Sequence, residues 1–222
     1  MGPRRRAIYM STSIWWIRRD LRLADNQALS AAAASSEMVL PLFILDPRLL
    51  TSSYAGTQRI AFLFAGLRSL AQDLRRLGSR LLVRQGEPDE ILAALLPKSG
   101  ATAIYAEEDY SPYARQRDAR VRDALPMILT AGLTVHPPEL VLKKDGQPYT
   151  VFTPFSKAWK ALPQPQEKNL LPMPGALNTP VGLPSLRIPD VPTLSDQVPF
   201  IPGEVEAIRR LKEFTSDEES SV

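Results

Sequence analysis

The chain has 222 residues, enough for one α/β domain with a sizeable extension. It has no cysteine and a single histidine, which excludes disulfides and thiolate metal sites and leaves little room for a histidine-based metal site or catalytic triad. The formal net charge of +3 is weak evidence for a polyanionic partner, and no apolar run is long enough to span a membrane, so we expect a cytoplasmic protein without membrane contact.

The N-terminal part of the sequence predicts two buried strands separated by a helix. Residues 1–12, which include a run of three arginines, are expected to form a disordered leader. Ser13–Arg18 is rich in β-branched and aromatic residues, and Met38–Leu45 is a second apolar run, so both are expected to be buried strands. Between them, Asn26 can cap an alanine-rich helix at Gln27–Ser35.

The next segment predicts two further helix–strand units. Apolar residues three and four apart follow Thr57, and they predict a long amphipathic helix that ends near Gly78. Arg80–Arg84 is the expected third strand. A helix that begins at Pro88 then leads to the fourth strand at Ala101–Ala106.

The last helix–strand unit contains a helix breaker. Pro126 falls inside the helix that Ser111 and Pro112 open, and a proline interrupts a helix interior. We therefore predict that this helix breaks there and that a short apolar turn follows at residues 128–129. The fifth strand is then expected at Leu133–His136.

Buried strands that alternate with helices predict an α/β fold, a doubly wound five-stranded parallel sheet of the Rossmann type, over residues 13–136. In such folds ligands bind beyond the C-terminal ends of the strands. The loops after Arg18, Leu45, Arg84 and Ala106 are therefore expected to surround one crevice.

A long proline-rich extension follows the predicted sheet. Residues 137–203 contain 14 of the 21 prolines and no periodic apolar pattern, so we predict an extended interdomain connector. Residues 204–222 are expected to begin a helical domain and to end in a polar tail. The helix at Glu204–Phe214 carries an apolar stripe without an obvious partner, so the stripe is expected to fold back on the sheet domain, to fray, or to mediate self-association. This stripe consists of Val205, Ile208, Leu211 and Phe214.

Motifs of several enzyme classes are absent from the sequence. No GxGxxG follows a strand, and there is no GxxxxGK[ST] loop and no GxSxG elbow. No pair of carboxylates is placed so that it demands acid–base chemistry. We therefore expect a binding domain with no catalytic residues.

The densest polar motif is Trp16–Leu29, which reads WIRRDLRLADNQAL and leaves the first strand at the ligand edge of the sheet. Its arginines can hold an anionic or polar ligand by charge-assisted hydrogen bonds. On the charges alone, a surface loop of internally paired side chains is the alternative.

This string resembles the opening signature of the DNA photolyase/cryptochrome family, W-x-R-R-D-L-R-L-x-D-N-x-A-L. Further segments resemble the same family in the same order, and the resemblance covers residues 13–214. These segments are LFILDP at 42–47, GSRLLVRQG at 78–86, DYSPYARQRD at 109–118, YTVFTPFSKAW at 149–159 and PGE at 202–204 with the helix that follows.

The resemblance implies an N-terminal α/β domain that carries a light-harvesting antenna chromophore. Photolyases use light and FAD to split pyrimidine dimers in DNA, a lyase reaction, and cryptochromes use a similar body for signalling. In the family, a C-terminal helical domain binds FAD and the flipped lesion. The resemblance therefore implies that this chain alone, which stops where that domain begins, lacks FAD, DNA contacts and repair activity.

Flavin and deazaflavin antennae of the family bind at the strand ends. The matching positions here are Arg19, Asp46, Arg59, Asp109 and Ser111. Ser111 stands where deazaflavin-binding members often have glutamate, which removes one acceptor. Tyr113 and Ala114 stand where the folate pattern has Asn-Glu, which argues against methenyltetrahydrofolate.

Three alternatives are left open by the sequence. Arg19 and Arg59 can instead pair with the aspartates of the same edge and tie loops together. The crevice can be empty, which makes the domain a chromophore-free remnant. The chain can also be a nucleotide-binding or signalling module, such as a universal-stress-type domain, although Glu107–Asp109 would repel phosphate where that class has its glycine-rich loop.

Overall fold

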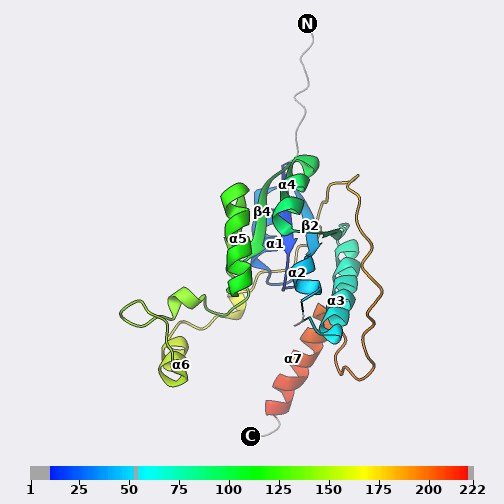
Figure 1. Cartoon of the computed structure of the whole chain (residues 1–222). Coiled ribbons are helices and arrows are strands. Elements are labelled where there is room, and N and C mark those ends of the chain that lie inside the picture. The colour runs from blue at the N-terminus through cyan, green and yellow to red at the C-terminus, as the bar shows by residue number, and fades with distance from the viewer. Residues whose placement is uncertain (1–10, 53–54, 220–222) are drawn as a thin grey trace.

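The computed structural model of the chain describes residues 11–52 and 55–219 (Figure 1). A disordered leader was predicted at residues 1–12. Residues 1–10 lie outside the described residues, and Thr12 belongs to the first strand. The last three residues of the predicted polar tail also lie outside them.

Five parallel strands form one sheet in the order β3-β2-β1-β4-β5. The chain builds outward from β1 in one direction and then returns to add β4 and β5 on the other side. This is the arrangement of a doubly wound fold, so the predicted fold class is confirmed. The strands are β1 (Thr12–Ile17), β2 (Met38–Leu45), β3 (Leu82–Gln85), β4 (Ala101–Glu107) and β5 (Met127–Thr130). The α-helices are α1 (Gln27–Ser35), α2 (Pro47–Leu50), α3 (Thr57–Arg76), α4 (Pro88–Ser99), α5 (Pro112–Ala124), α6 (Phe152–Lys160) and α7 (Glu204–Glu219).

Helices cover both faces of the sheet and enclose two hydrophobic cores (Figure 1). On one face, Trp15 and Ile17 of β1 pack with α1 and α3. On the other face, Ile14 and Trp16 pack with α4 and α5. Successive side chains of a strand point to opposite faces, so the apolar run Ile14–Ile17 of β1 contributes to both cores.

Replacement of Leu67 tests the assignment of the first of these cores. Its side chain is fully buried, so replacement by alanine removes apolar contacts and leaves a cavity. We expect Leu67→Ala to lower the free energy of unfolding by about 2–5 kcal/mol in urea denaturation. Leu49 is 51% exposed, and Leu49→Ala is the control that should cost less than about 1 kcal/mol. Equal losses in the two variants would contradict the core assignment.

The fifth strand begins earlier than the sequence predicted. α5 ends before Pro126, and β5 pairs with β4 directly after it. The predicted turn at residues 128–129 and the predicted strand at Leu133–His136 are therefore wrong. Pro126 ends the helix, and its carbonyl accepts the N–H of Ile104 of β4 at an N···O distance of 2.9 Å, so the same proline leads straight into the new strand.

The connector at residues 137–203 contains the helix α6, which the sequence analysis missed. Aromatic residues three and four apart were the available signal. They are Phe152, Phe155 and Trp159. The later part of the connector runs beside the sheet, where the N–H of Leu186 donates to the carbonyl of Val83 at 3.0 Å. This segment covers the otherwise free edge of β3.

α7 is anchored to the sheet domain at its first residue. The Glu204 carboxylate accepts the backbone N–H groups of Leu23 and Ala24 at 2.8 and 3.0 Å. The helix continues past the predicted end at Phe214 and projects away from the sheet (Figure 1). Its apolar stripe has exposed fractions of 44% to 72%, and self-association through the stripe stays a prediction.

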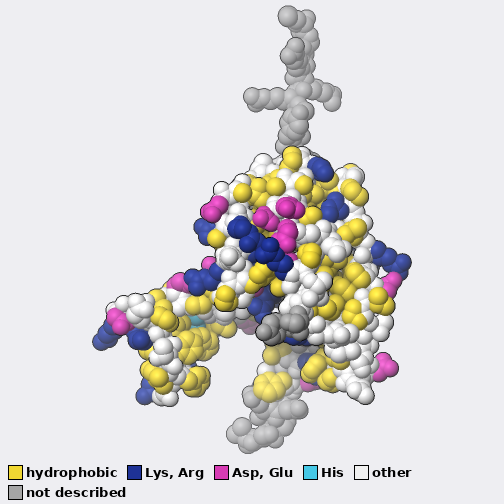
Figure 2. All heavy atoms as spheres, in the orientation of Figure 1, with side chains coloured by type: hydrophobic (Ala, Val, Ile, Leu, Met, Phe, Trp, Pro, Cys, Tyr) yellow, Lys and Arg dark blue, Asp and Glu magenta, His cyan; other side chains and the backbone are white. Residues whose placement is uncertain are grey.

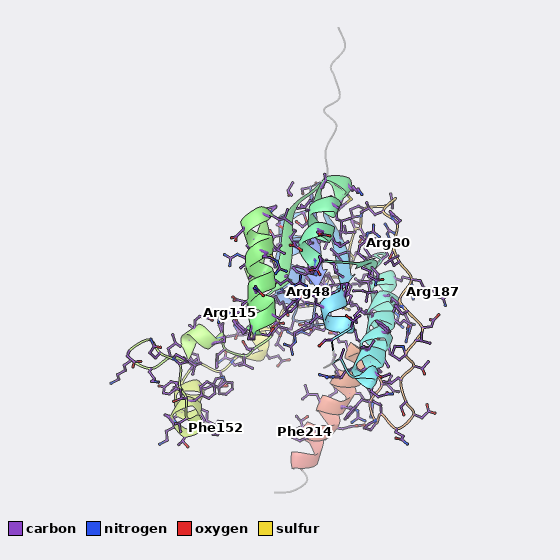
Figure 3. The ribbon with its side chains drawn as sticks, in the orientation of Figure 1. Arg48, Arg80, Arg115, Phe152, Arg187 and Phe214 are labelled. Atoms are coloured by element: carbon purple, nitrogen blue, oxygen red, sulfur yellow. The ribbon has the colours of Figure 1, made fainter. Side chains whose placement is uncertain are left out.

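The two projecting helices carry apolar surface. Figure 2 shows apolar side chains gathered on α6 and on the projecting part of α7. Phe152 and Phe214 lie far from the sheet in Figure 3, and they are 77% and 64% exposed. No helix in the described ranges combines the length and apolar character needed to cross a membrane.

Candidate functional site

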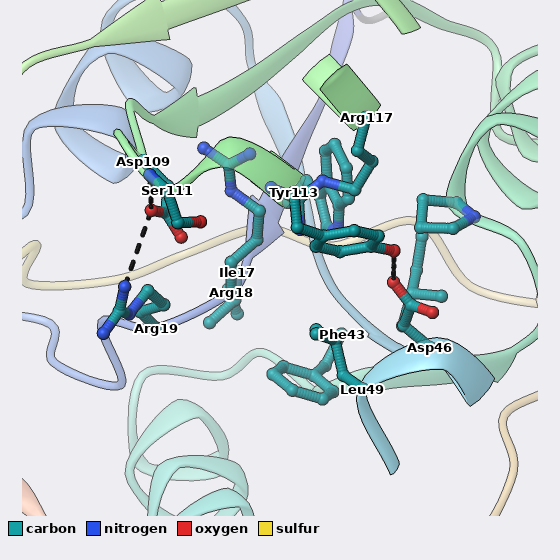
Figure 4. A pocket seen from close by; sticks show the side chains of 13 residues that line it. Ile17, Arg18, Arg19, Phe43, Asp46, Leu49, Asp109, Ser111, Tyr113 and Arg117 are labelled. Atoms are coloured by element: carbon teal, nitrogen blue, oxygen red, sulfur yellow. Dashed lines mark hydrogen bonds and ion pairs between the residues drawn. The ribbon is translucent and has the colours of Figure 1, made fainter. Parts of the chain in front are cut away.

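A cavity of about 240 Å³ lies beyond the C-terminal ends of β1, β2 and β4, at the edge where the sequence predicted a crevice (Figure 4). β1 lies between β2 and β4, so the loops that follow these three strands adjoin. Four of the five predicted site residues line the cavity. They are Arg19, Asp46, Asp109 and Ser111.

Arg59 lies outside this cavity. It is exposed in the first turn of α3 and lines a groove of about 300 Å³ together with Arg48. Leu49 of α2 lines both spaces, so the groove and the cavity adjoin at that side chain. The sequence did not predict the short helix α2, whose Leu49 separates the groove of Arg59 from the cavity.

Asp109 is held by the backbone of its own loop and by an arginine. Its Oδ1 accepts the N–H of Ser111 at 3.0 Å and lies 3.5 Å from Nη1 of Arg19, whose side chain is 66% exposed. Burial raises the pKa of Asp109, but the hydrogen bonds from Ser111 and the charges of Arg19 and Arg18 outweigh it, so this pKa lies below its usual value. Ser111 also caps α5 by accepting the N–H of Ala114 at 3.3 Å.

Both carboxylate oxygens of Asp46 bind protein groups. Oδ1 caps α2 by accepting the N–H of Arg48 at 2.9 Å, and Oδ2 accepts the hydroxyl of Tyr113. Burial, and then the hydrogen bond to Asp46, raise the pKa of Tyr113 to about 12. The sequence analysis used Tyr113 only as a departure from the folate pattern, whereas the structure makes its ring a wall of the cavity.

A buried cluster of two arginines and one aspartate borders the cavity. Nη1 of Arg18 donates to both oxygens of Asp118 at 2.6 Å, and Nε of Arg117 donates to Oδ1 at 2.9 Å. Both guanidinium groups lie over the ring of Trp16, at 5.0 and 4.9 Å from its centroid. Burial lowers the pKa of Arg18, against the charge of Asp118.

Arg117 has one further donor in this cluster, its Nη2. Nη2 of Arg117 is buried and lies 2.8 Å from Oδ1 of Asp118, but it makes no hydrogen bond to any described residue. Arg117 also lines the cavity, so its Nη2 can donate to a ligand while the guanidinium stays paired with Asp118.

The carboxyl groups of Asp20 and Glu107 interact with each other beside this cluster. Glu107 is buried, and a Cβ at Gly132 would lie 2.2 Å from its Oε1. Burial, and then the hydrogen bond and charge of Asp20, raise the pKa of Glu107 to about 8. Burial also raises the pKa of Asp20. The pair therefore holds a proton at neutral pH. The sequence analysis did not find it, because the two residues lie far apart in the chain.

The walls of the cavity combine apolar side chains with guanidinium donors. Ile17, Phe43 and Leu49 supply apolar walls, and Arg19 and Arg117 supply donors. The described residues that line it include no histidine, cysteine or lysine.

Residues 13–174 match the family model of DNA photolyase. The chain belongs to the DNA photolyase family. The matched range contains every residue that lines the cavity. The deoxyribodipyrimidine photo-lyase of Synechococcus sp. is 36% identical over 231 aligned residues, which cover 90% of this chain and 44% of that relative.

Solved photolyase structures share this fold. The bacterial class III photolyase from Agrobacterium tumefaciens has a TM-score of 0.83 and 27% identity over 95% of this chain and 45% of its own. The archaeal photolyase from Sulfolobus tokodaii has a TM-score of 0.62 and 29% identity over 76% of this chain and 38% of its own. The latter is described with two FAD molecules and the implication of a novel light-harvesting cofactor. This chain therefore spans less than half the length of these photolyases.

Proposed function

We propose that this chain is a light-harvesting, chromophore-binding domain of a DNA photolyase and that its antenna is a flavin or a deazaflavin. The observation that carries the proposal is the cavity at the strand ends, with apolar walls and guanidinium donors. An antenna passes energy through space, so it needs a chromophore held at a fixed distance and orientation and needs no nucleophile or base. Light-driven splitting of pyrimidine dimers in DNA is the process that this energy would serve.

The residues present fit the ring system of such a chromophore. The cavity, at about 240 Å³, is smaller than most ligand pockets, which measure roughly 300–1,000 Å³, so it suits a flat ring with its side chain outside. A ring carbonyl would accept a hydrogen bond from Nη2 of Arg117, which is paired with Asp118 but forms no hydrogen bond to a described residue. Arg19 offers a second planar set of donors at the mouth. A tail that passes Leu49 would reach the groove that Arg59 lines.

A chromophore-free domain is the second candidate. Asp46, Asp109 and Ser111 already bind protein groups, and Arg19 pairs with Asp109, as the loop-tying alternative requires. An absorbance spectrum of the purified protein separates the two candidates. Visible bands support the antenna, and a spectrum of protein alone supports the second candidate. A flavin antenna is favoured because the second FAD described in the Sulfolobus tokodaii photolyase offers a precedent on a similar fold.

Titration of riboflavin, FMN and a deazaflavin into the purified chain tests the site. We expect Arg19→Ala to weaken the binding of all three by about tenfold to a hundredfold, because a charge-assisted hydrogen bond is lost. Arg59→Ala should weaken FMN but not riboflavin, since only a phosphate-bearing tail gains from that groove.

Arg75→Ala is the matched control, because Arg75 is an exposed arginine on the same helix as Arg59 and lines neither space. It should bind all three ligands like the wild type. The site assignment is wrong if none of the three binds the wild-type chain, or if Arg19→Ala binds them as tightly as the wild type does.

A further inference from the structure

Tyr113 connects two sides of the cavity. It lies in the first turn of α5, and its hydroxyl donates to Oδ2 of Asp46 at the end of β2. Its side chain therefore reaches from the loop that follows β4 to the loop that follows β2 (Figure 4).

The ring of Tyr113 is held in a defined position. The guanidinium of Arg117 lies 5.6 Å from the ring centroid, and Asp46 holds the hydroxyl. Phe43 and Leu49 lie on the other side of the ring from Arg117 in the close view (Figure 4). A flat molecule in this space would meet an aromatic ring on one side and apolar side chains on the other.

Asp46 is engaged in a way that keeps it from contacting a ligand. One oxygen caps α2 and the other binds Tyr113, so a direct bond to a chromophore would have to break one of these contacts. Asp46 is buried at 4% exposure, which further favours a role behind the ring of Tyr113.

We propose that Tyr113 determines which ring systems the cavity accepts, by stacking on a flat three-ring chromophore, and that Asp46 is the residue that positions its ring. The inference rests on the proposed function and adds to it the residue that sets ring selectivity. Stacking strengthens with the overlap of the two ring faces, so a three-ring flavin gains more from Tyr113 than a two-ring lumazine does.

The test compares riboflavin with 6,7-dimethyl-8-ribityllumazine, which has the same ribityl chain on two rings. Dissociation constants are measured from ligand fluorescence. We expect the wild type to bind riboflavin about tenfold more tightly than the lumazine. Tyr113→Phe keeps the aromatic ring but removes the hydroxyl that Asp46 holds, so the ring is no longer positioned and the preference should be lost. Tyr113→Leu keeps apolar bulk without the ring, and the preference should disappear.

Two variants of Asp46 separate positioning from helix capping. Asp46→Asn keeps the oxygen that caps α2 and places its amide NH2 where it can donate to the hydroxyl oxygen of Tyr113, so it should keep the preference. Asp46→Ser also caps a helix well but is too short to reach Tyr113, so it should lose the preference although α2 stays capped. Tyr149→Leu, which changes a tyrosine outside the cavity, is the control for general effects.

The outcomes distinguish this inference from the proposed function. A riboflavin preference that survives Tyr113→Leu overturns the inference and leaves the flavin site standing. A preference that survives Asp46→Ser overturns the positioning role of Asp46. If neither ligand binds the wild type, both the inference and the proposed function fail. Asp46→Ser does not alter the Tyr113 side chain itself, so it tests the inference even where Tyr113→Leu fails to fold.

Discussion

Replacement of Asp118 by asparagine is expected to lower the free energy of unfolding by about 3–5 kcal/mol. The carboxylate of Asp118 is 5% exposed and pairs with both Arg18 and Arg117. Without its charge, two buried guanidinium groups would face each other over Trp16 with no counterion between them. Urea denaturation followed by circular dichroism measures the loss.

Asp123→Asn is the control for this prediction. Asp123 lies on the same helix α5 and is exposed, so removal of the same charge should change the free energy of unfolding by less than about 0.5 kcal/mol. A loss of less than about 1 kcal/mol in Asp118→Asn would show that water or a rearranged side chain compensates the two arginines.

Replacement of Glu107 by glutamine is expected to make stability nearly independent of pH between about 5 and 8. Burial, and then Asp20, raise the pKa of Glu107 to about 8 in the folded chain, against 4.5 for an unperturbed glutamate. Because the folded chain holds this proton more tightly than the unfolded chain, wild-type stability is greatest below pH 4.5 as far as this group is concerned. The contribution of Glu107 to stability is lost as the pH rises towards 8.

Glutamine keeps the size of Glu107 and carries no charge. Its amide can donate to Asp20 and still accept the N–H of Gln27, which Oε1 of Glu107 accepts at 3.2 Å. We expect Glu107→Gln to exceed the wild type by about 1–3 kcal/mol in free energy of unfolding at pH 8 and to match it at pH 5.

Glu37→Gln, at an exposed position, should follow the wild type at both pH values. Denaturation curves at pH 5 and pH 8 for the three proteins provide the measurement. Parallel loss of stability in the wild type and Glu107→Gln would mean that another group causes the pH dependence.

Local patterns were enough to predict most of the elements that form the site. The helix Gln27–Ser35 and the strand Met38–Leu45 have the predicted bounds, since an alanine-rich run after a cap and a continuous apolar run are local signals. Asn26 caps the helix as expected, because its Oδ1 accepts the N–H of Leu29 at 2.8 Å. Gly78, with φ of +77°, provides the left-handed residue that ends the long helix α3.

The signals failed where an element is short or interrupted. Met127–Thr130 has four residues, too few for an apolar run to differ from a turn after a proline. α6 was missed because prolines dominate the segment around it, although its aromatic residues have helical spacing. For β5, pairing with β4 supplied the stability that local preference did not show.

The sequence by itself determined the fold class, the family resemblance and the edge of the sheet at which the polar residues gather, because strand direction and parallel pairing follow from alternating local elements. Only the tertiary structure decided which side chains meet there. Arg18 and Asp118 are 100 residues apart and pair because β1 and β4 become neighbours. The meeting of Asp46 with Tyr113 has the same origin, since it depends on the strand order and on the paths of two loops. The packing of helices on both faces of the sheet sets this order and these paths, and no local pattern contains that information.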